Sequence, residues 1–313
     1  MAKVRAILVN PDVTGKLALG EIDAPVPRAN EALVRVHAIS LNRGEVNRAQ
    51  NSPAGLLLGW DVGGVVEQAA ADGTGPKAGE RVVGVLQVGA WAELIAVPST
   101  NLAVLPDSVS FEVASTFPVA GLTALYALDR APGLAGRNVL VTGASGGVGN
   151  FAIQIAKHGG ATVTGLVRQE KHAQAVLDAG ADHAVADESG EAARQYAPYH
   201  VILEAVGGPV LANALTMLAP FGNMVVYGVS MGGQITLDST VFLRSRGTVS
   251  GLAVFTELHK ETAGAGLARL AKMVEQGAVK PLISLTAPWS EAGSVARQLL
   301  DRSYPGKAVL KVE

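Results

Sequence analysis

Residues 138–149 have the sequence NVLVTGASGGVG, and this stretch predicts the fold of the second half of the chain. The apolar run at 138–142 indicates a buried strand, the glycines indicate a tight turn, and residues 148–158 form a predicted helix. The N–H groups at the start of such a helix bind anions, and glycine lets a pyrophosphate approach the backbone. Gly149 would also allow the helix to pack closely on the strand. The alternative is a turn that binds no ligand.

Strands and helices keep alternating after this turn. We predict strands at 161–167, 183–185, 201–205, 223–229 and 248–253, and helices at 170–179 and 209–218. Apolar strands that alternate with helices are typical of an α/β fold with a doubly wound parallel sheet, the Rossmann arrangement. Ligands bind such a sheet at the carboxyl ends of its strands. The residues predicted to contact a dinucleotide there are Ser145, Gly146, Gly147, Val148, Gly207, Gly228, Ser230 and Leu252.

The first third of the chain has a different pattern. Short β-rich runs at 4–9, 32–38, 63–68, 81–86 and 92–97 are separated by turn-forming residues, which predicts a small antiparallel barrel or sandwich. Residues 111–128 and 259–275 have helical spacing, and the tail returns to a strand at 308–312. For 313 residues we expect two domains. Their predicted bounds are 1–117 for the β domain and 118–256 for the cofactor domain, with 257–313 returning to the first domain.

Composition excludes several classes of protein. The net charge is −2 with both signs well mixed, so no nucleic-acid partner is expected. The chain has no cysteine, which removes disulfides, thiolate metal sites and a cysteine nucleophile. The first residues have no long apolar run typical of a signal peptide. No apolar run reaches the roughly 18 residues of a membrane helix. We therefore expect a cytoplasmic protein without a membrane partner.

The charge that follows the second strand of the predicted sheet indicates which dinucleotide is bound. Domains that prefer NAD carry Asp or Glu about 20 residues after the glycine turn, to bind the ribose 2′-hydroxyl. Arg168 lies nineteen residues after Gly149, and Lys171 follows one helical turn later. Both cations suit a 2′-phosphate, which favours NADPH. The alternatives are that both side chains only face solvent, and that Asp187 repels a 2′-phosphate if it comes close.

A second enzyme class has a similar glycine pattern. The short-chain dehydrogenases share the T-G-x-x-x-G-x-G spacing of residues 142–149. Their pattern belongs near the start of the chain, whereas about 140 residues come first here. Their catalytic Tyr-x-x-x-Lys pair is also missing. The similarity to that class is therefore only local.

The chain as a whole resembles the medium-chain dehydrogenase/reductase superfamily, in its zinc-independent quinone oxidoreductase-like branch. The resemblance rests on the order and spacing of EALVRV at 31–36, SLNRGE at 40–45, LGWDVGGVV at 58–66, KAGERV at 77–82, GAWAE at 89–93, GLTA at 121–124, ASGGVG at 144–149 and GKAVL at 306–310. It implies a GroES-like β-barrel catalytic domain joined to a Rossmann domain that binds NADP. It also implies a homodimer, with the β-rich segment 248–255 pairing across a two-fold axis.

The zinc-binding residues of the superfamily are replaced in this chain. Zinc alcohol dehydrogenases carry a Cys in the active-site loop, a His-Glu pair after a glycine, and a later Cys. Here the corresponding residues are Asn42, Trp60 and Asp61, and the six histidines are scattered. We therefore predict no metal site and a mechanism without a Lewis acid.

Without zinc, the favourable hydride acceptors are already electrophilic, as are quinones and α,β-unsaturated carbonyls. Asn42 is the first catalytic candidate, because the family's matching Asn lies beside the nicotinamide and substrate and its amide stabilises charge on oxygen. The alternative is that Asn42 only stabilises a turn. Glu45 is the second candidate, as a residue that orders the loop or relays a proton. Thr123 matches the family threonine that contacts the nicotinamide.

Three hypotheses for function follow. The first is an NADPH-dependent oxidoreductase of quinones or of the C=C bond of enones. The second is an enoyl-reductase step in a biosynthetic pathway, and the third is a cofactor-binding relative with little catalytic activity. Asn47 stands where quinone reductases often carry Tyr, which weakens the case for a quinone as physiological substrate. Trp60 and Trp91 either line the substrate cleft or belong to the core.

Overall fold

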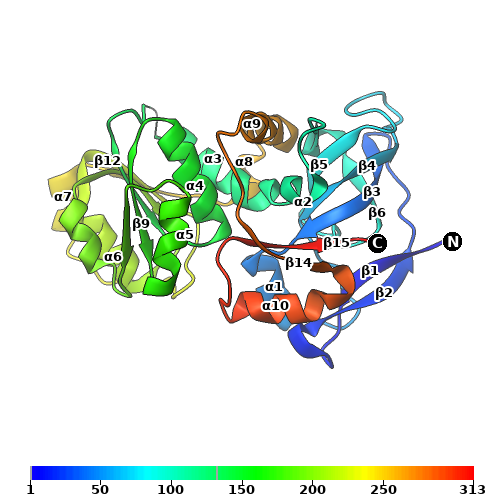
Figure 1. The fold of residues 1–313 in the computed structure, drawn as a ribbon, viewed down its shortest axis with the longest axis horizontal. Coiled ribbons are helices and arrows are strands. Elements are labelled where there is room, and N and C mark those ends of the chain that lie inside the picture. The colour runs from blue at the N-terminus through cyan, green and yellow to red at the C-terminus, as the bar shows by residue number, and fades with distance from the viewer. Residues whose placement is uncertain (1, 132) are drawn as a thin grey trace. The chain divides into compact units, whose positions relative to one another are not determined.

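Two units divide the chain in the computed structural model, which describes residues 2–131 and 133–313 (Figure 1). The first unit comprises the residues up to Leu122 together with Leu258–Gly277 and Pro281–Glu313. The second comprises Thr123–Glu257 and Ala278–Lys280. Within the described ranges, no helix is both long and apolar enough to span a bilayer.

The second unit is built on a six-stranded, wholly parallel sheet with the order β10-β9-β8-β11-β12-β13. This order is that of a doubly wound sheet, with its switch point between β8 and β11, and it confirms the predicted fold class. The strands are β8 (Asn138–Thr142), β9 (Thr162–Val167), β10 (His183–Ala186), β11 (Tyr199–Glu204), β12 (Leu218–Val226) and β13 (Thr248–Gly251).

Helices cover both faces of this sheet, as right-handed crossovers require. In Figure 1, α4 and α5 lie on one side of the sheet and α6 lies on the other. The buried core on the α6 side joins residues of the sheet, such as Leu140 and Ile202, to Val210 and Leu215 of α6. The helices of this unit are α3 (Leu122–Asp129), α4 (Gly147–His158), α5 (Ala173–Asp178), α6 (Gly208–Thr216), α7 (Thr240–Ser245) and α8 (Val254–Glu257), with 3-10 turns η4 (Glu170–His172) and η5 (Glu191–Tyr196).

The first unit contains a seven-stranded sheet with the order β14-β15-β3-β4-β5-β7, in which β6 also pairs with β3. All its pairs are antiparallel except β14 with β15, and β1 and β2 form a separate antiparallel hairpin. Its buried core combines strand residues with Trp91 and Trp289. The strands are β1 (Lys3–Val9), β2 (Leu17–Asp23), β3 (Glu31–Ser40), β4 (Asp61–Gln68), β5 (Arg81–Val85), β6 (Leu94–Pro98), β7 (Leu102–Val104), β14 (Ile283–Pro288) and β15 (Lys307–Lys311).

The first unit also contains α-helices and a π-helical turn, besides the short 3-10 turns η1 (Thr14–Lys16), η2 (Ser99–Asn101) and η6 (Trp289–Glu291), and two of the predicted helices differ from those observed. The single helix expected over 111–128 is divided into α2, a wider π-helical turn η3 and α3 of the second unit, because Pro118 has no N–H to donate. Helix α9 begins four residues later than expected, at the cap that Thr262 provides for the N–H of Ala265. These helices are α1 (Arg43–Gln50), α2 (Phe111–Ala114), η3 (Phe117–Gly121), α9 (Ala263–Glu275) and α10 (Ala292–Leu300).

Several elements were not predicted from the sequence. These are strands β2, β7 and β14 and helices α1 and α10. Strand β7 has only three residues and α1 is mostly polar, so their apolar periodicity is weak. Strand β12 begins five residues before its predicted start, because the segment with Pro220 and Gly222 joins the sheet with an irregular register instead of forming a turn.

Candidate active site

The glycine turn between β8 and α4 requires glycine at two positions. Gly143 has a φ of +59°, a conformation that side chains other than glycine rarely adopt. At Gly149 a Cβ would lie 2.5 Å from the carbonyl oxygen of Ala144. The helix therefore packs directly on the turn, as the sequence predicts, and no larger residue would fit.

The residues predicted to bind a pyrophosphate lie together at the start of α4. Gly146 is the N-cap of this twelve-residue helix and has no side chain that could cap it. Gly147 and Val148 begin the first turn, where N–H groups have no partner within the helix. Ser145 immediately precedes the cap and is partly exposed. This end of α4 combines unpaired N–H donors with the positive end of the helix dipole.

Three more predicted residues lie at the carboxyl edge of the same sheet, after β11 and β12. Gly207 has a φ of +76°, and a Cβ there would lie 2.2 Å from the carbonyl oxygen of Gly232. At Gly228 a Cβ would lie 2.8 Å from the carbonyl oxygen of Ala205. The N–H of Ser230 donates to that same carbonyl at 3.3 Å. The loops after two neighbouring strands are thus in direct backbone contact, with no room for side chains.

Leu252 and Thr123 complete the predicted set in this unit. Leu252 directly follows β13 and is buried, and its N–H donates to the carbonyl of Val226 at 2.8 Å. It therefore lies at the carboxyl edge of the sheet. Thr123 is a buried residue of α3 and the first residue of the second unit.

Sequence reasoning missed a buried carboxylate at this edge. Glu204 is the last residue of β11 and is fully buried. Its Oε1 accepts hydrogen bonds from the N–H groups of Val206 and Gly207, at 2.8 and 3.0 Å, and from the hydroxyl of Thr142 at 3.1 Å. Burial raises the pKa of Glu204, and these hydrogen bonds oppose the shift. An acid at the end of an otherwise apolar strand was the only signal in the sequence.

Arg168 and Lys171 are both exposed and lie close to the carboxyl end of β9. Burial lowers the pKa of His172, and the positive charges of Lys171 and Arg168 lower it further. The two cations therefore act on the same imidazole, and together they make a cationic region at this strand end.

Asp187 lies beside this region, since its N–H donates to the carbonyl of Val167. Its carboxylate is turned into its own loop, where it accepts hydrogen bonds from the N–H groups of Ala192 and Ser189 and from the hydroxyl of Ser189. The bond from Ala192 is the main reason that the pKa of Asp187 is lowered. Asp187 is therefore a charged neighbour of the cations whose oxygens are engaged elsewhere.

The catalytic candidates of the first unit lie in a polar cluster at three strand ends. Ser40 ends β3, Asp61 begins β4 and Lys307 begins β15, while Asn42 is the N-cap of α1. Asp61 is fully buried, and the side chain of Lys307 is 5% exposed. Their ion pair measures 3.3 Å, and the hydroxyl of Ser40 donates to the same Oδ2 of Asp61 at 2.8 Å. We call these residues, together with Glu45, the Asn42 cluster.

The side-chain amide of Asn42 is fully engaged within this cluster. Its Nδ2 donates to Oδ2 of Asp61 at 2.6 Å and to Oε1 of Glu45 at 3.2 Å. Its Oδ1 accepts from Nζ of Lys307 at 2.6 Å. Asn42 thus also stabilises the start of α1, and the bond to Glu45 is the longest of the three.

Glu45 has the one buried side-chain oxygen of the cluster that lacks a hydrogen-bond partner. Its Oε1 accepts two donors of Asn42, the backbone N–H at 2.7 Å and Nδ2 at 3.2 Å, whereas its buried Oε2 has no partner. Burial raises the pKa of Glu45 well above its usual value, Asp61 adds to the shift, and Lys307 opposes it. A protonated Glu45 leaves one carboxylate and one ammonium in the cluster, so its net charge is zero, as burial favours.

The two tryptophans that the sequence suggested as cleft or core residues, Trp60 and Trp91, differ in their surroundings. Trp91 is fully buried in the core of the first unit, and a Cβ at Gly59 would clash with its ring. Trp60 is partly exposed, donates from Nε1 to the carbonyl of Gln87, and packs over Gly44. Trp91 is therefore a core residue, whereas Trp60 lies next to the helix that carries Glu45.

The residues present do not form a zinc site at these positions. Across the part of the chain that the structure describes, no group of three His, Asp or Glu side chains is placed to hold a metal ion. Both oxygens of Asp61 are engaged, Oδ1 by the N–H of Val119 and Oδ2 by Ser40, Asn42 and Lys307. An amide and an indole beside a saturated carboxylate are a poor donor set for zinc.

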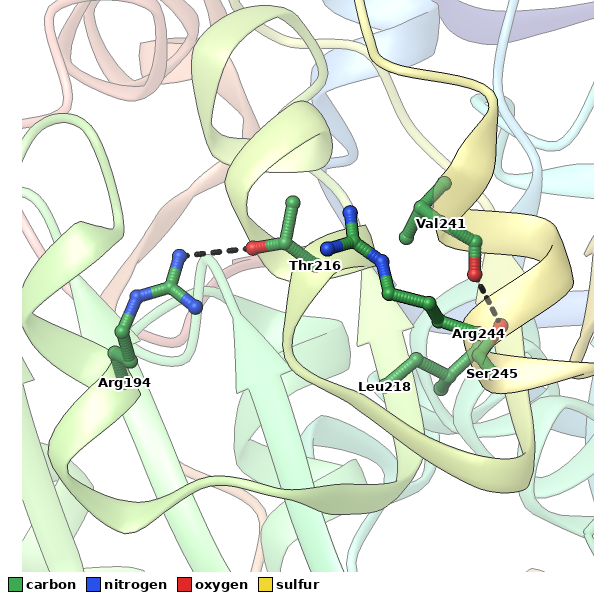
Figure 2. A pocket seen from close by; sticks show the side chains of 6 residues that line it. All are labelled: Arg194, Thr216, Leu218, Val241, Arg244 and Ser245. Atoms are coloured by element: carbon green, nitrogen blue, oxygen red, sulfur yellow. Dashed lines mark hydrogen bonds between the residues drawn. The ribbon is translucent and has the colours of Figure 1, made fainter.

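A separate pocket of about 240 Å³ lies at the opposite edge of the second unit's sheet, before β11, β12 and β13 (Figure 2). Figure 2 shows Arg194 bonded to Thr216, with Arg244 on the other side of that hydroxyl. Arg194 also pairs with Glu191 at 2.5 Å, and Arg244 lies 3.8 Å from Asp238. Both arginines of the pocket thus have an acidic neighbour. The pocket is also not at the edge where doubly wound sheets bind nucleotides.

Comparisons with known proteins agree with both units. Residues 28–107 match the family described as alcohol dehydrogenase GroES-like domain. Residues 147–272 match the family described as zinc-binding dehydrogenase. The two matches cover the polar cluster around Asn42 except Lys307, and the glycine turn from Gly147 onward.

Similar proteins include oxidoreductases. The chain is 28% identical to the human mitochondrial NAD(P)H oxidoreductase RTN4IP1 over 331 residues, which covers 90% of this chain and 82% of the relative. A structure of mycobacterial Rv1454c complexed with NADPH superposes with a TM-score of 0.87 at 26% identity, over 98% of this chain and 99% of that one. The quinone oxidoreductase from Coxiella burnetii superposes with a TM-score of 0.83 at 26% identity, over the full length of both chains.

Proposed function

The chain belongs to the medium-chain dehydrogenase/reductase superfamily, and from this premise we propose that it is a zinc-independent, NADPH-dependent reductase. Its proposed acceptors are quinones or the C=C bond of α,β-unsaturated carbonyls. The observation that carries this proposal is the chemistry of the Asn42 cluster, which offers an amide, an ammonium and carboxyl groups but neither thiolate nor imidazole. Such a set suits acceptors that are already electrophilic.

The second unit supplies the proposed cofactor site. The N-terminus of α4 would hold the pyrophosphate of NADPH, and the loops at Gly207 and Gly228 would line the path of the dinucleotide. Arg168 and Lys171 would bind the 2′-phosphate, because they are exposed cations at the end of β9 that act on the same imidazole, His172. When bound, NADPH supplies the hydride. The similarity to Rv1454c, whose structure was solved with NADPH, supports NADPH as the proposed cofactor.

In the first unit, Asn42 is the proposed donor to the acceptor's oxygen. The Nδ2 hydrogen that Glu45 accepts at 3.2 Å makes the weaker of the two bonds that Nδ2 donates, so a substrate oxygen can compete with Oε1 of Glu45 for this hydrogen while the planar amide stays in place. Lys307 and Asp61 hold the rest of the amide in place. Burial raises the pKa of Glu45, which favours a proton on this carboxyl group, and a protonated Glu45 would keep the cluster neutral while the acceptor gains negative charge.

The edge of the second unit's sheet supports a proposed homodimer. Strand β13 is the last strand of that sheet, and Val249 on it is exposed. An unpaired strand edge is a template for a second copy of the chain. Val249→Lys should convert the dimer to monomers, because it places a charge on the proposed interface, and light scattering measures this change. A native protein that is already monomeric would contradict the proposal.

Incubation with an enone and NADPH deuterated at the transferred position tests the proposed reaction. Mass spectrometry and NMR should find deuterium on carbon, with a saturated ketone as product. Simple ketones should react far more slowly, since the amide, indole and saturated carboxylate of this site are a poor donor set for a metal that would polarise them. Deuterium on a carbinol carbon, with the alkene intact, would contradict reduction at the C=C bond. Tight NADPH binding without turnover of any enone or quinone would favour a cofactor-binding relative with little activity.

A further inference from the structure

The two strands that flank the switch point of the second unit's sheet are joined by their last side chains. Thr142 ends β8 and Glu204 ends β11, and both are fully buried. The Thr142 hydroxyl donates to Oε1 of Glu204 at 3.1 Å and accepts the N–H of Ala205 at 2.9 Å. A doubly wound sheet opens its binding crevice at this point, because helices leave the two strands on opposite faces.

These two side chains hold the turn that follows β11. The N–H of Ala205 points to Thr142, and those of Val206 and Gly207 point to Glu204, so three successive N–H groups are directed inward. A single carboxylate accepts the last two together with the Thr142 hydroxyl. The turn is therefore fixed from inside the unit, without any ligand.

The turn after β11 also fixes the loop that follows β12. The carbonyl oxygens of Ala205 and Val206 accept the N–H groups of Ser230 and Met231, at 3.3 and 2.7 Å. Glycine is required on both sides of this contact, at Gly207 and Gly228, because a Cβ at either would collide with backbone. Glu204 is thus the common anchor of three segments: the end of β8, the turn after β11 and the loop after β12.

We propose that Glu204 is a positioning residue for the dinucleotide, which it serves by holding the backbone of these three segments in the shape that the cofactor fits. The Thr142 hydroxyl is its partner in this role. Neither side chain needs to touch the cofactor, since both are buried beneath the turn. This inference rests on the proposed NADPH-dependent function.

The hydrogen bonds of Glu204 and Thr142 decide which substitutions test their proposed positioning role. Glu204→Gln keeps the size of the side chain and can keep Oε1 as an acceptor, but its NH₂ group then takes the place of Oε2. That group cannot accept from the N–H of Gly207, which lies 3.1 Å from Oε2, and faces it as a second donor. Thr142→Val keeps the shape and removes only the hydroxyl, whereas Thr142→Ser retains it. Tyr199→Phe is a matched control, because it removes a buried hydrogen bond, to the carbonyl of Ala193 at 2.7 Å, from the opposite end of the same strand.

Titration calorimetry with NADPH, together with KM and kcat for an enone, measures the effect. Glu204→Gln and Thr142→Val should weaken NADPH binding and raise its KM on the order of 10- to 100-fold, as small displacements of positioning groups do. At saturating NADPH, kcat should change much less. Thr142→Ser should bind like the native protein. Tyr199→Phe should lower the melting temperature without changing NADPH affinity.

Two outcomes separate failure of this inference from failure of the proposed function. Native protein that binds NADPH, with Glu204→Gln and Thr142→Val binding equally well, would overturn the role of Glu204 alone. Native protein that binds neither NADPH nor NADH would overturn the proposed function and this inference with it. If Glu204→Gln does not fold, the comparison of Thr142→Val with Thr142→Ser decides, and equal affinities of those two variants would again overturn the role.

Discussion

Nζ of Lys307 lies 2.6 Å from Oδ1 of Asn42, although 265 positions separate the two residues in the chain. The contact exists because β15 adds to the sheet beside β3, with Val309 opposite Ser40. The same ammonium donates to the carbonyl of Leu41 at 3.0 Å and pairs with Asp61 at 3.3 Å. The last strand of the chain therefore supplies the only cation of the Asn42 cluster among the residues that the structure describes.

Lys307→Met should lower the free energy of unfolding by about 3–5 kcal/mol, because removing one partner of a buried ion pair leaves Asp61 as an uncompensated charge. Urea unfolding measures this change. Lys311→Met is the control on the same strand: Lys311 is exposed and lies 3.7 Å from Glu112, so its loss should cost at most about 1 kcal/mol. Adding Asp61→Asn to Lys307→Met should recover part of the stability. Equal stability of the Lys307 and Lys311 variants would contradict the buried pair.

Glu45→Gln should change how stability depends on pH. The pKa of Glu45 is raised in the folded protein above its ordinary value of 4.5, so the folded state binds the extra proton between those two values. The stabilising contribution of Glu45 to the free energy of unfolding is therefore complete below about pH 4.5. It is lost as the pH rises toward the pKa of the folded protein, and the free energy of unfolding then falls by at most about 1.4 kcal/mol per pH unit. Unfolding free energies from pH 5 to 8 should fall more steeply for the native protein than for Glu45→Gln. Parallel curves would mean that Glu45 is ionised in the folded protein.

Asn42→Ala should lower kcat by about 10²-fold and leave KM for the enone nearly unchanged, as expected for a donor whose bond strengthens in the transition state. Asn51→Ala, at the other end of α1, is the control and should retain activity. Melting temperatures show whether each variant is folded at the assay temperature. If KM rises while kcat is unchanged, Asn42 contributes to substrate binding and not to the chemical step.

Arg168→Ala should reduce NADPH affinity by about 10- to 150-fold, the effect of losing one charge-assisted hydrogen bond to a 2′-phosphate. NADH affinity should change little, because NADH has no such phosphate. Arg194→Ala removes an arginine at the opposite edge of the sheet and should leave both affinities unchanged. A native preference for NADH would show that Asp187 outweighs Arg168 and Lys171.

The sequence was sufficient where local chemistry determines structure. The strand-turn-helix at 138–158 was predictable because apolar periodicity and glycine act over neighbouring residues, and the alternation that follows it specifies a doubly wound parallel sheet. That topology in turn places Gly207, Gly228 and Leu252 at one edge. The three-residue strand β7 and the mostly polar helix α1 were missed, because they depend on pairing and packing with other elements, β5 and α10 respectively, more than on their own pattern.

By itself, then, the sequence determined the fold class and the glycine turn at Gly143 and Gly149. Only the tertiary structure decided which partners the buried polar groups find: Lys307 for Asn42, and Thr142 for Glu204, 62 positions away. Strand register selects these partners, because it sets which side chains meet at a strand end. Burial then makes their hydrogen bonds obligatory, since an unpaired polar group away from water is costly.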